Sequence, residues 1–159
     1  MTVENPSRVL VVDDEPMVTR TLEAVLRVEG NLKCVAVNRP AEALDRLRAE
    51  PFEVILSDFV MPELDGLEFL AQAREIQPET SRILLTGYAN KDSAIRSIND
   101  IGLFQYIEKP WDNTNLLIVL RNALERRFLV RTLQEKITEI DRAQGKLSGL
   151  QNDILRTFI

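Results

Sequence analysis

Five polar residues directly follow short apolar segments of the chain, and their types could hold a cation beside an anion. They are Asp13, Asp14, Asp58, Thr86 and Lys109. Carboxylates a few ångström apart raise one another's pKa unless a cation sits between them. Oxygen ligands without histidine or thiolate favour a hard ion, and a site completed by phosphate oxygens and water suits Mg²⁺. A lysine and a hydroxyl facing the carboxylates would suit a tetrahedral oxyanion, so the set favours phosphoryl transfer.

Each of these residues has a simpler interpretation when it is taken alone. The acidic run before Pro16 could cap a helix and complement its dipole. Asp58 could be an ordinary loop residue at the end of a strand, and Thr86 could belong to a plain turn. The placement of all of them at the ends of strands that share one edge is what favours a functional site.

The elements that must position these residues alternate between buried strands and amphipathic helices. Strands are expected at 9–12, 32–37, 54–56, 83–85 and 103–107. Helices are expected between Pro16 and Gly30, at 40–49, 67–76 and 91–99, and from about 112 almost to the end. This alternation requires a parallel sheet covered on both faces, an α/β fold. In the strand order 2-1-3-4-5, strands one and three are neighbours, and their carboxylates converge where such sheets bind ligands.

Composition excludes several classes of protein. The chain has 159 residues, 45% of them hydrophobic and 28% charged, which suits one soluble domain with an appendage. It has no histidine, so histidine triads, histidine-ligated zinc or haem, and a phosphohistidine on this chain are excluded. Its one cysteine, Cys34, is most simply a small buried side chain in a reducing compartment. No apolar run approaches the roughly 20 residues that span a bilayer, and we expect a cytoplasmic protein with no membrane association.

Charge is spread unevenly along the chain. Residues 1–115 contain 12 Lys and Arg against 20 Asp and Glu, a net charge of −8, whereas residues 116–159 contain 8 against 5, a net charge of +3. An acidic body argues against binding through phosphate neutralisation, so no direct nucleic-acid binding is expected. Charges of alternating sign in the last segment are typical of a solvated helix.

Four segments resemble the motifs of the receiver domain of two-component response regulators. In chain order they read VLVVDDEP, VILSDFVMPELDG, ILLTGY and YIEKPWD, and the resemblance covers residues 8 to about 125. It implies the flavodoxin-like (CheY-like) fold, a doubly wound five-stranded parallel sheet of order 2-1-3-4-5, here with an extended C-terminal helix. It also implies a signalling domain rather than an enzyme, one that takes a phosphoryl group from a sensor histidine kinase or a phosphotransfer protein.

The resemblance assigns the acidic residues to phosphoryl transfer. Asp58 matches the phosphoacceptor of the family. Asp13 and Asp14 match the acidic pair that holds Mg²⁺, with Asp14 as the direct ligand and Asp13 acting through water. Asp58 itself and the backbone carbonyl of Val60 would complete the protein ligands of the metal.

The resemblance also assigns a switch. Thr86 and Lys109 match the hydroxyl and the lysine that contact the phosphoryl oxygens, and the Lys109–Pro110 peptide is expected to be cis. Tyr106 matches the aromatic residue that turns inward as the threonine moves, although an ordinary strand aromatic would look the same. The surface formed by helix four, strand five and helix five would carry the change.

Two further side chains are expected to set the lifetime of the phosphorylated state. Val60 lies two residues after Asp58, and Tyr88 lies two residues after Thr86, so both should project over the mouth of the site. Neither is a good base for orienting the water that hydrolyses an aspartyl phosphate. We therefore expect slow self-dephosphorylation, unless Tyr88 points into solvent and the lifetime is set elsewhere.

The last part of the chain carries a heptad pattern. Its apolar and glutamine positions alternate by three and four residues, at Val130, Leu133, Ile137, Ile140, Gln144, Leu147, Gln151, Ile154 and Phe158. We name this set the heptad seam. It predicts a parallel homodimer in which Lys136 faces Asp141 of the second copy, with a frayed continuation of the preceding helix as the alternative.

These observations divide the chain into a receiver at 1–125 and a coiled-coil signalling helix at 126–159, with an output domain outside this chain. Receivers with a YIEKPWD-like motif and such a helix often precede an HD-GYP-like or other enzymatic output. A stand-alone adaptor that binds partners after phosphorylation is a second possibility. A fragment of a DNA-binding regulator is less expected, because no helix-turn-helix pattern follows residue 125.

Overall fold

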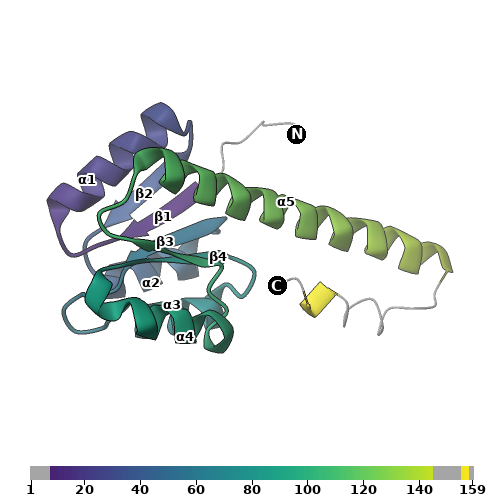
Figure 1. The fold of residues 1–159 in the computed structure, drawn as a ribbon. Helices are drawn as coiled ribbons and strands as arrows, with labels where there is room; N and C mark the ends of the chain where they lie inside the picture. The colour runs from purple at the N-terminus through teal and green to yellow at the C-terminus, as the bar shows by residue number, and fades with distance from the viewer. Residues whose placement is uncertain (1–7, 145–154, 158–159) are drawn as a thin grey trace.

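The protein is built on a five-stranded, fully parallel sheet (Figure 1). The computed structural model describes residues 8–144 and 155–157. The strands are β1 (Arg8–Val12), β2 (Lys33–Val37), β3 (Val54–Asp58), β4 (Ser81–Thr86) and β5 (Gln105–Glu108). They pair in the order β2-β1-β3-β4-β5, which confirms the predicted order 2-1-3-4-5 and the CheY-like fold.

Helices cover both faces of the sheet, and one of them extends far beyond it. The helices are α1 (Pro16–Ala24), continued by the π-helical η1 (Val25–Glu29), then α2 (Pro40–Ala49), α3 (Gly66–Ile76), the 3-10 turn η2 (Tyr88–Asn90), α4 (Lys91–Asp100) and α5 (Asn113–Gln144). Figure 1 shows α1 and α5 on one face of the sheet and α2, α3 and α4 on the other. The distal half of α5 projects away from the body.

The central strands read as continuous apolar runs because both of their faces are buried. Residues 9–12 are fully buried, and they alternate between two hydrophobic clusters. Val9 and Val11 pack with α1 and α5, whereas Leu10 and Val12 pack with α2 and α3. This two-sided core holds the strand ends in fixed positions at one edge of the sheet.

Several predicted strand boundaries differ from the structure. The third strand runs to Asp58 rather than to Leu56, and the fourth covers Ser81–Thr86 rather than 83–85. The fifth strand begins at Gln105, opposite Ile83, rather than at Leu103. Leu103 is buried in the core, but it follows Gly102, whose φ of +64° turns the chain before pairing begins. The apolar side chain of Leu103 therefore reflects its place in the core and does not indicate that it pairs in the sheet. The last helix is described to Gln144, so Leu147, Gln151, Ile154 and Phe158 of the heptad seam lie outside the described residues.

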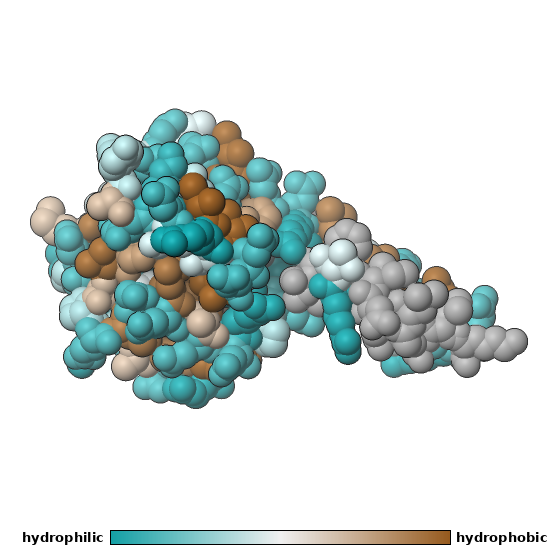
Figure 2. Space-filling model, turned by 60° about the horizontal axis from the view of Figure 1, so that its bottom comes forward, coloured by the Kyte–Doolittle hydropathy of each residue, from teal (hydrophilic) through white to brown (hydrophobic). Residues whose placement is uncertain are grey.

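Within the described part of the chain, none of the helices has both the length and the apolar character needed to cross a bilayer. The extended helix α5 is long enough, but charged residues recur along it. Figure 2 shows a largely hydrophilic surface on one side of the molecule, with apolar side chains recurring along the projecting part.

Candidate functional site

Three carboxylates gather at the carboxyl ends of β1 and β3. Asp13 and Asp14 follow β1, and Asp58 is the last residue of β3, the neighbour of β1 in the sheet. One oxygen from each carboxylate can be chosen so that all three atoms lie within 4.8 Å of one another. The predicted convergence of these carboxylates is confirmed.

Asp13 is the buried member of this group. Its Oδ1 accepts a hydrogen bond from the backbone N–H of Glu15 at 2.9 Å. Its Oδ2 is buried and accepts no hydrogen bond from any residue that the structure describes, and Lys109 Nζ lies 3.8 Å away. Burial raises the pKa of Asp13 to about 6. A buried carboxylate oxygen of this kind, beside two further carboxylates, fits a hard divalent cation such as Mg²⁺.

Asp58 is held by a charged partner. Its Oδ1 accepts hydrogen bonds from Lys109 Nζ at 2.6 Å and from the backbone N–H of Phe59 at 3.0 Å. Asp58 is only 6% exposed, so little water screens its interaction with the lysine. Lys109 follows β5, and the Lys109–Pro110 peptide is cis, as the resemblance implies.

The two predicted switch residues lie on neighbouring strands. Thr86 ends β4 and is fully buried, and its hydroxyl donates to the Gly87 carbonyl at 3.2 Å. Its own carbonyl accepts from the backbone N–H of Lys109 at 2.8 Å, which joins the ends of β4 and β5. Tyr106 lies on β5, half-buried, and packs against the cluster beneath α2, α3 and α4.

The two residues expected to set the lifetime are open to solvent. Val60 is 62% exposed and Tyr88 is 84% exposed. Val60 lies in the loop after β3 and Tyr88 begins η2 after β4, so both lie at the rim of the site. The high exposure of Tyr88 matches the alternative in which its side chain points into solvent and the lifetime is set elsewhere.

One supporting residue was missed by the sequence analysis. Asn38 directly follows β2, and its side-chain amide donates to the Asp13 carbonyl at 2.9 Å and to the Thr19 hydroxyl at 3.0 Å. It fixes the backbone that carries the acidic pair. The sequence could have indicated Asn38, because it is a polar residue at a strand end like the other site residues. It follows β2, the outer strand of the sheet, and not one of the strands whose carboxylates converge.

The raised pKa of Asp13 predicts a pH-dependent effect on stability. The folded protein binds this proton more tightly than the unfolded chain, so stability from this group is lost as pH rises through about 6. The measured quantity is the free energy of unfolding of Asp13→Asn minus that of the wild type, in metal-free buffer. This difference should be about 1–3 kcal/mol more positive at pH 8 than at pH 3.5. Urea unfolding at the two pH values measures this.

Mg²⁺ and a surface variant provide the controls. The cation should stabilise the wild type at pH 8 and leave Asp13→Asn unchanged, since it binds the folded state alone. Asp45→Asn, a solvent-exposed change of the same charge, is the surface control, and Mg²⁺ should stabilise it as it does the wild type. An Asp13→Asn difference that is the same at both pH values would contradict an ionised, buried carboxylate at this position.

Comparison with known proteins agrees with this geometry. The family model for the response regulator receiver domain matches residues 9–121. The hydrogenase transcriptional regulatory protein HoxA of Cupriavidus necator is 39% identical over 127 residues, which are 79% of this chain and 26% of that protein. The C4-dicarboxylate transport transcriptional regulatory protein DctD of Pseudomonas aeruginosa is 35% identical over 147 residues, 90% of this chain and 31% of that protein. The chain thus spans less than a third of the length of these relatives.

Solved structures show the same architecture. The signal receiver domain of an HD domain-containing protein from Pseudomonas fluorescens Pf-5 has a TM-score of 0.76 and 30% identity, covering 83% of this chain and 96% of that one. A structure titled adenylate cyclase from Rhodopirellula baltica has a TM-score of 0.79 and 26% identity, covering 84% and 98%. With the family match over most of its length, the chain belongs to the response regulator receiver domain family of two-component systems.

Proposed function

We propose that the protein accepts a phosphoryl group on Asp58 from a phosphohistidine of a sensor kinase or phosphotransfer protein, with Mg²⁺ as cofactor. The observation that carries this proposal is the gathering of three carboxylates within 4.8 Å, together with Lys109 Nζ 2.6 Å from Asp58. Asp13, Asp14, Asp58 and the Val60 carbonyl would hold the cation. When bound, Mg²⁺ would neutralise charge on the phosphoryl oxygens.

The chain's own residues position the reaction. A carboxylate oxygen of Asp58 attacks phosphorus, the new P–O bond forms, and the electron pair of the breaking P–N bond leaves with the donor imidazole. Because the transition state of phosphoryl transfer is loose, positioning and charge do most of the work. Lys109 and the Phe59 N–H hold the carboxylate in place. After transfer, Lys109 and the Thr86 hydroxyl would bind phosphoryl oxygens.

The response would travel through Thr86 and Tyr106. To reach a phosphoryl oxygen, the Thr86 hydroxyl must give up its hydrogen bond to the Gly87 carbonyl. Its movement would leave room for Tyr106, which is only half-buried and can turn further inward. The exposed pair Lys91–Glu108, at 3.6 Å, joins α4 to β5 and lies on the surface that would change. Phosphorylation would thus shift a two-state surface rather than deform the core.

Acetyl phosphate tests the proposal without a kinase. With Mg²⁺, the wild type should gain the mass of one phosphoryl group, measured on the intact protein, and Asp58→Asn should gain none. Asp45→Asn removes an exposed carboxylate on α2 and should be labelled like the wild type. A phosphoryl group on Asp58→Asn would place the acceptor elsewhere.

The phosphorylated state is proposed to be long-lived. Hydrolysis needs a water in line behind phosphorus, and Val60 and Tyr88 at the rim offer no good base to orient it. Val60→Asn combined with Tyr88→Ala should shorten the lifetime about tenfold, a change of about 1.4 kcal/mol in the barrier. Loss of the phosphorylated mass after removal of the donor measures the lifetime. An unchanged or longer lifetime would contradict a role of Val60 and Tyr88 in slowing the hydrolysis.

The heptad seam is proposed to form a parallel homodimer. Leu133 and Ile140 on α5 are 39% and 45% exposed, as a side chain that awaits a partner should be. Leu133→Glu should weaken the dimer at least tenfold by burying a charge in the seam, measured by sedimentation equilibrium. Thr138→Glu, on the exposed face of the same helix, is the matched control. A chain truncated after Arg127 that dimerises as well as the wild type would move the interface onto the receiver body.

The output of the signal is proposed from relatives alone. The names of HoxA and DctD favour control of transcription, whereas the structure titled adenylate cyclase favours an enzymatic output. The relatives therefore support a DNA-binding regulator more strongly than the sequence analysis did. An adaptor without an output remains the third alternative, and the length and content of the native reading frame would discriminate among them.

A further inference from the structure

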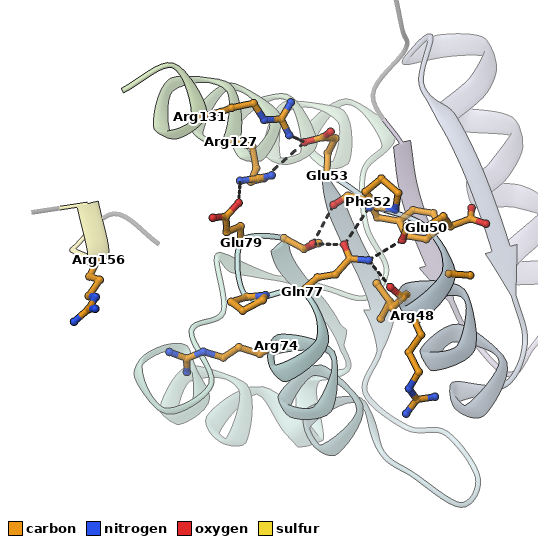
Figure 3. Close-up of a pocket in the computed structure, with 15 residues that line it drawn as sticks. Arg48, Glu50, Phe52, Glu53, Arg74, Gln77, Glu79, Arg127, Arg131 and Arg156 are labelled. Atoms are coloured by element: carbon orange, nitrogen blue, oxygen red, sulfur yellow. Dashed lines mark hydrogen bonds and ion pairs between the residues drawn. The ribbon is translucent and has the colours of Figure 1, made fainter. Parts of the chain in front are cut away.

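The part of α5 that extends beyond the core contacts the body at the amino ends of the strands, opposite the carboxyl ends where the three carboxylates lie. Glu53 immediately precedes β3, and its Oε2 lies 2.8 Å from Arg131 Nη2 and 3.7 Å from Arg127 Nε. Glu79, in the loop before β4, places its Oε2 3.6 Å from Arg127 Nη1. Figure 3 shows the two arginines pointing from α5 toward the two glutamates. Two glutamates, one from each of two loops, therefore form ion pairs with the same helix.

Burial strengthens part of this contact. The Arg127 side chain is only 11% exposed, and burial lowers its pKa, although the neighbouring carboxylates oppose that effect. Val130, one turn further along α5, is 8% exposed and lines a cavity with Pro78 and Phe104. Ion pairs that are shielded from water in this way are screened less than fully exposed ones.

We propose that Glu53 and Glu79 form a latch with Arg127 and Arg131 that holds the α5 extension in one direction relative to the receiver. We name these four residues the base latch. α5 continues beyond Arg131 to Gln144, and its distal half projects from the body (Figure 1), so the contacts of the base latch set the angle at which that part leaves the receiver. Without the latch, the helix could swing about its last contacts with the core.

The latched arrangement also keeps Val130 out of the proposed dimer interface. Val130 is the first residue of the heptad seam, yet it is buried and lines a cavity together with Pro78 and Phe104 of its own receiver. The same side chain cannot pack on the receiver and insert between two helices. The extension thus has two competing arrangements, latched with Val130 on the receiver, or released with Val130 in the seam. This second step rests on the coiled-coil dimer put forward above.

Distance measurements between two spin labels test the latch directly. Arg20→Cys on α1 and Ala143→Cys near the end of α5 carry the labels, in a Cys34→Ala background. Dilution with unlabelled protein removes distances between copies, and Mg²⁺ and phosphoryl donors are left out, so the result does not depend on Asp58 chemistry. The labelled chain that keeps Glu53 and Glu79 should give one narrow distribution of the distance between the two labels. Glu53→Gln with Glu79→Gln should at least double its width.

A matched variant and a change of salt guard against indirect effects. Glu125→Gln with Glu135→Gln removes the same charge from exposed positions of α5 and should keep the narrow distribution. In the labelled chain that keeps both glutamates, the distance distribution should also broaden in about 1 M NaCl, where the Debye length is about 3 Å, because the Arg131–Glu53 pair is partly exposed and is screened by salt. This test needs no substitution that could disturb folding. An equally narrow distribution in the latch variant, or equal broadening in the matched control, would overturn the latch.

Dimer affinity tests the competition for Val130. Sedimentation equilibrium should show the Glu53→Gln, Glu79→Gln variant dimerising about threefold to tenfold more tightly than the wild type, because release makes Val130 available to the seam. The matched control should equal the wild type. The spin labels could show that the latch variant frees the helix while its dimer is no tighter than that of the wild type. In that case the base latch holds α5, but the proposed competition between the receiver and the dimer for Val130 is overturned.

Discussion

Asp13→Asn combined with Asp14→Asn should slow phosphorylation by acetyl phosphate about 100-fold or more, which corresponds to about 2.7 kcal/mol of barrier. These carboxylates and Asp58 form the group that can hold a divalent cation in the described structure. With amides at these two positions, the transferred phosphoryl oxygens would keep the positive charge of Lys109 and the uncharged Thr86 hydroxyl, but they would lose the cation. Intact-mass measurement of the initial rate at saturating Mg²⁺ gives the result.

The matched control removes two carboxylates from the surface instead. Asp45→Asn on α2 with Glu135→Gln on α5 changes the net charge equally and should be phosphorylated at the wild-type rate. Urea unfolding of the double variant at saturating Mg²⁺ shows whether it is folded under the assay conditions, so that a slow rate is not ascribed to unfolding. A double variant at Asp13 and Asp14 that reacts within a few-fold of the wild type would contradict the assignment of the metal ligands.

Gly66→Ala should lower the free energy of unfolding by about 1–3 kcal/mol, the range seen when a well-packed site is overfilled. Gly66 begins α3, and its backbone N–H donates to the Phe59 carbonyl at 2.7 Å. A Cβ atom there would lie 2.2 Å from the Asp58 carbonyl and 2.9 Å from Phe59 Cα. Both neighbours are backbone atoms, so the strand end that carries the phosphoacceptor would have to move.

Gly87→Ala is the matched control for this effect. Gly87 also follows a strand that carries a site residue, but a Cβ atom there would meet nothing within 4 Å. Its unfolding free energy should remain within about 0.5 kcal/mol of the wild type, as for an ordinary surface substitution. Urea unfolding of the two variants under the same conditions compares them. Equal stability of Gly66→Ala and Gly87→Ala would contradict the close approach of α3 to Asp58.

Much of the fold could be predicted because the central strands are buried on both faces. Runs such as Val9–Val12 must be apolar throughout, and the helices between them require parallel pairing. The convergence of Asp13, Asp14 and Asp58 follows from that topology, since neighbouring parallel strands end at the same edge. Local pattern and global topology agree at these positions, so few residues were enough to locate the site.

What the sequence could not predict depends on contacts between distant segments. Glu53 and Glu79 look like ordinary surface acids, and only the path of α5 brings them to Arg127 and Arg131. Val130 fits a heptad pattern equally well whether it faces its own receiver or a second helix, because both surfaces demand an apolar side chain. A periodic pattern specifies which face of a helix is apolar, and it does not specify what covers that face.

Chemical mapping of the phosphorylated residue tests the central claim most directly. Borohydride reduces an aspartyl phosphate to homoserine, so wild-type protein treated with acetyl phosphate and Mg²⁺ can be reduced, digested and sequenced by mass spectrometry. The account predicts homoserine at position 58, in the peptide containing Ser57 and Phe59. Homoserine at another aspartate, or a phosphoryl group that resists borohydride and so is not an acyl phosphate, would contradict it.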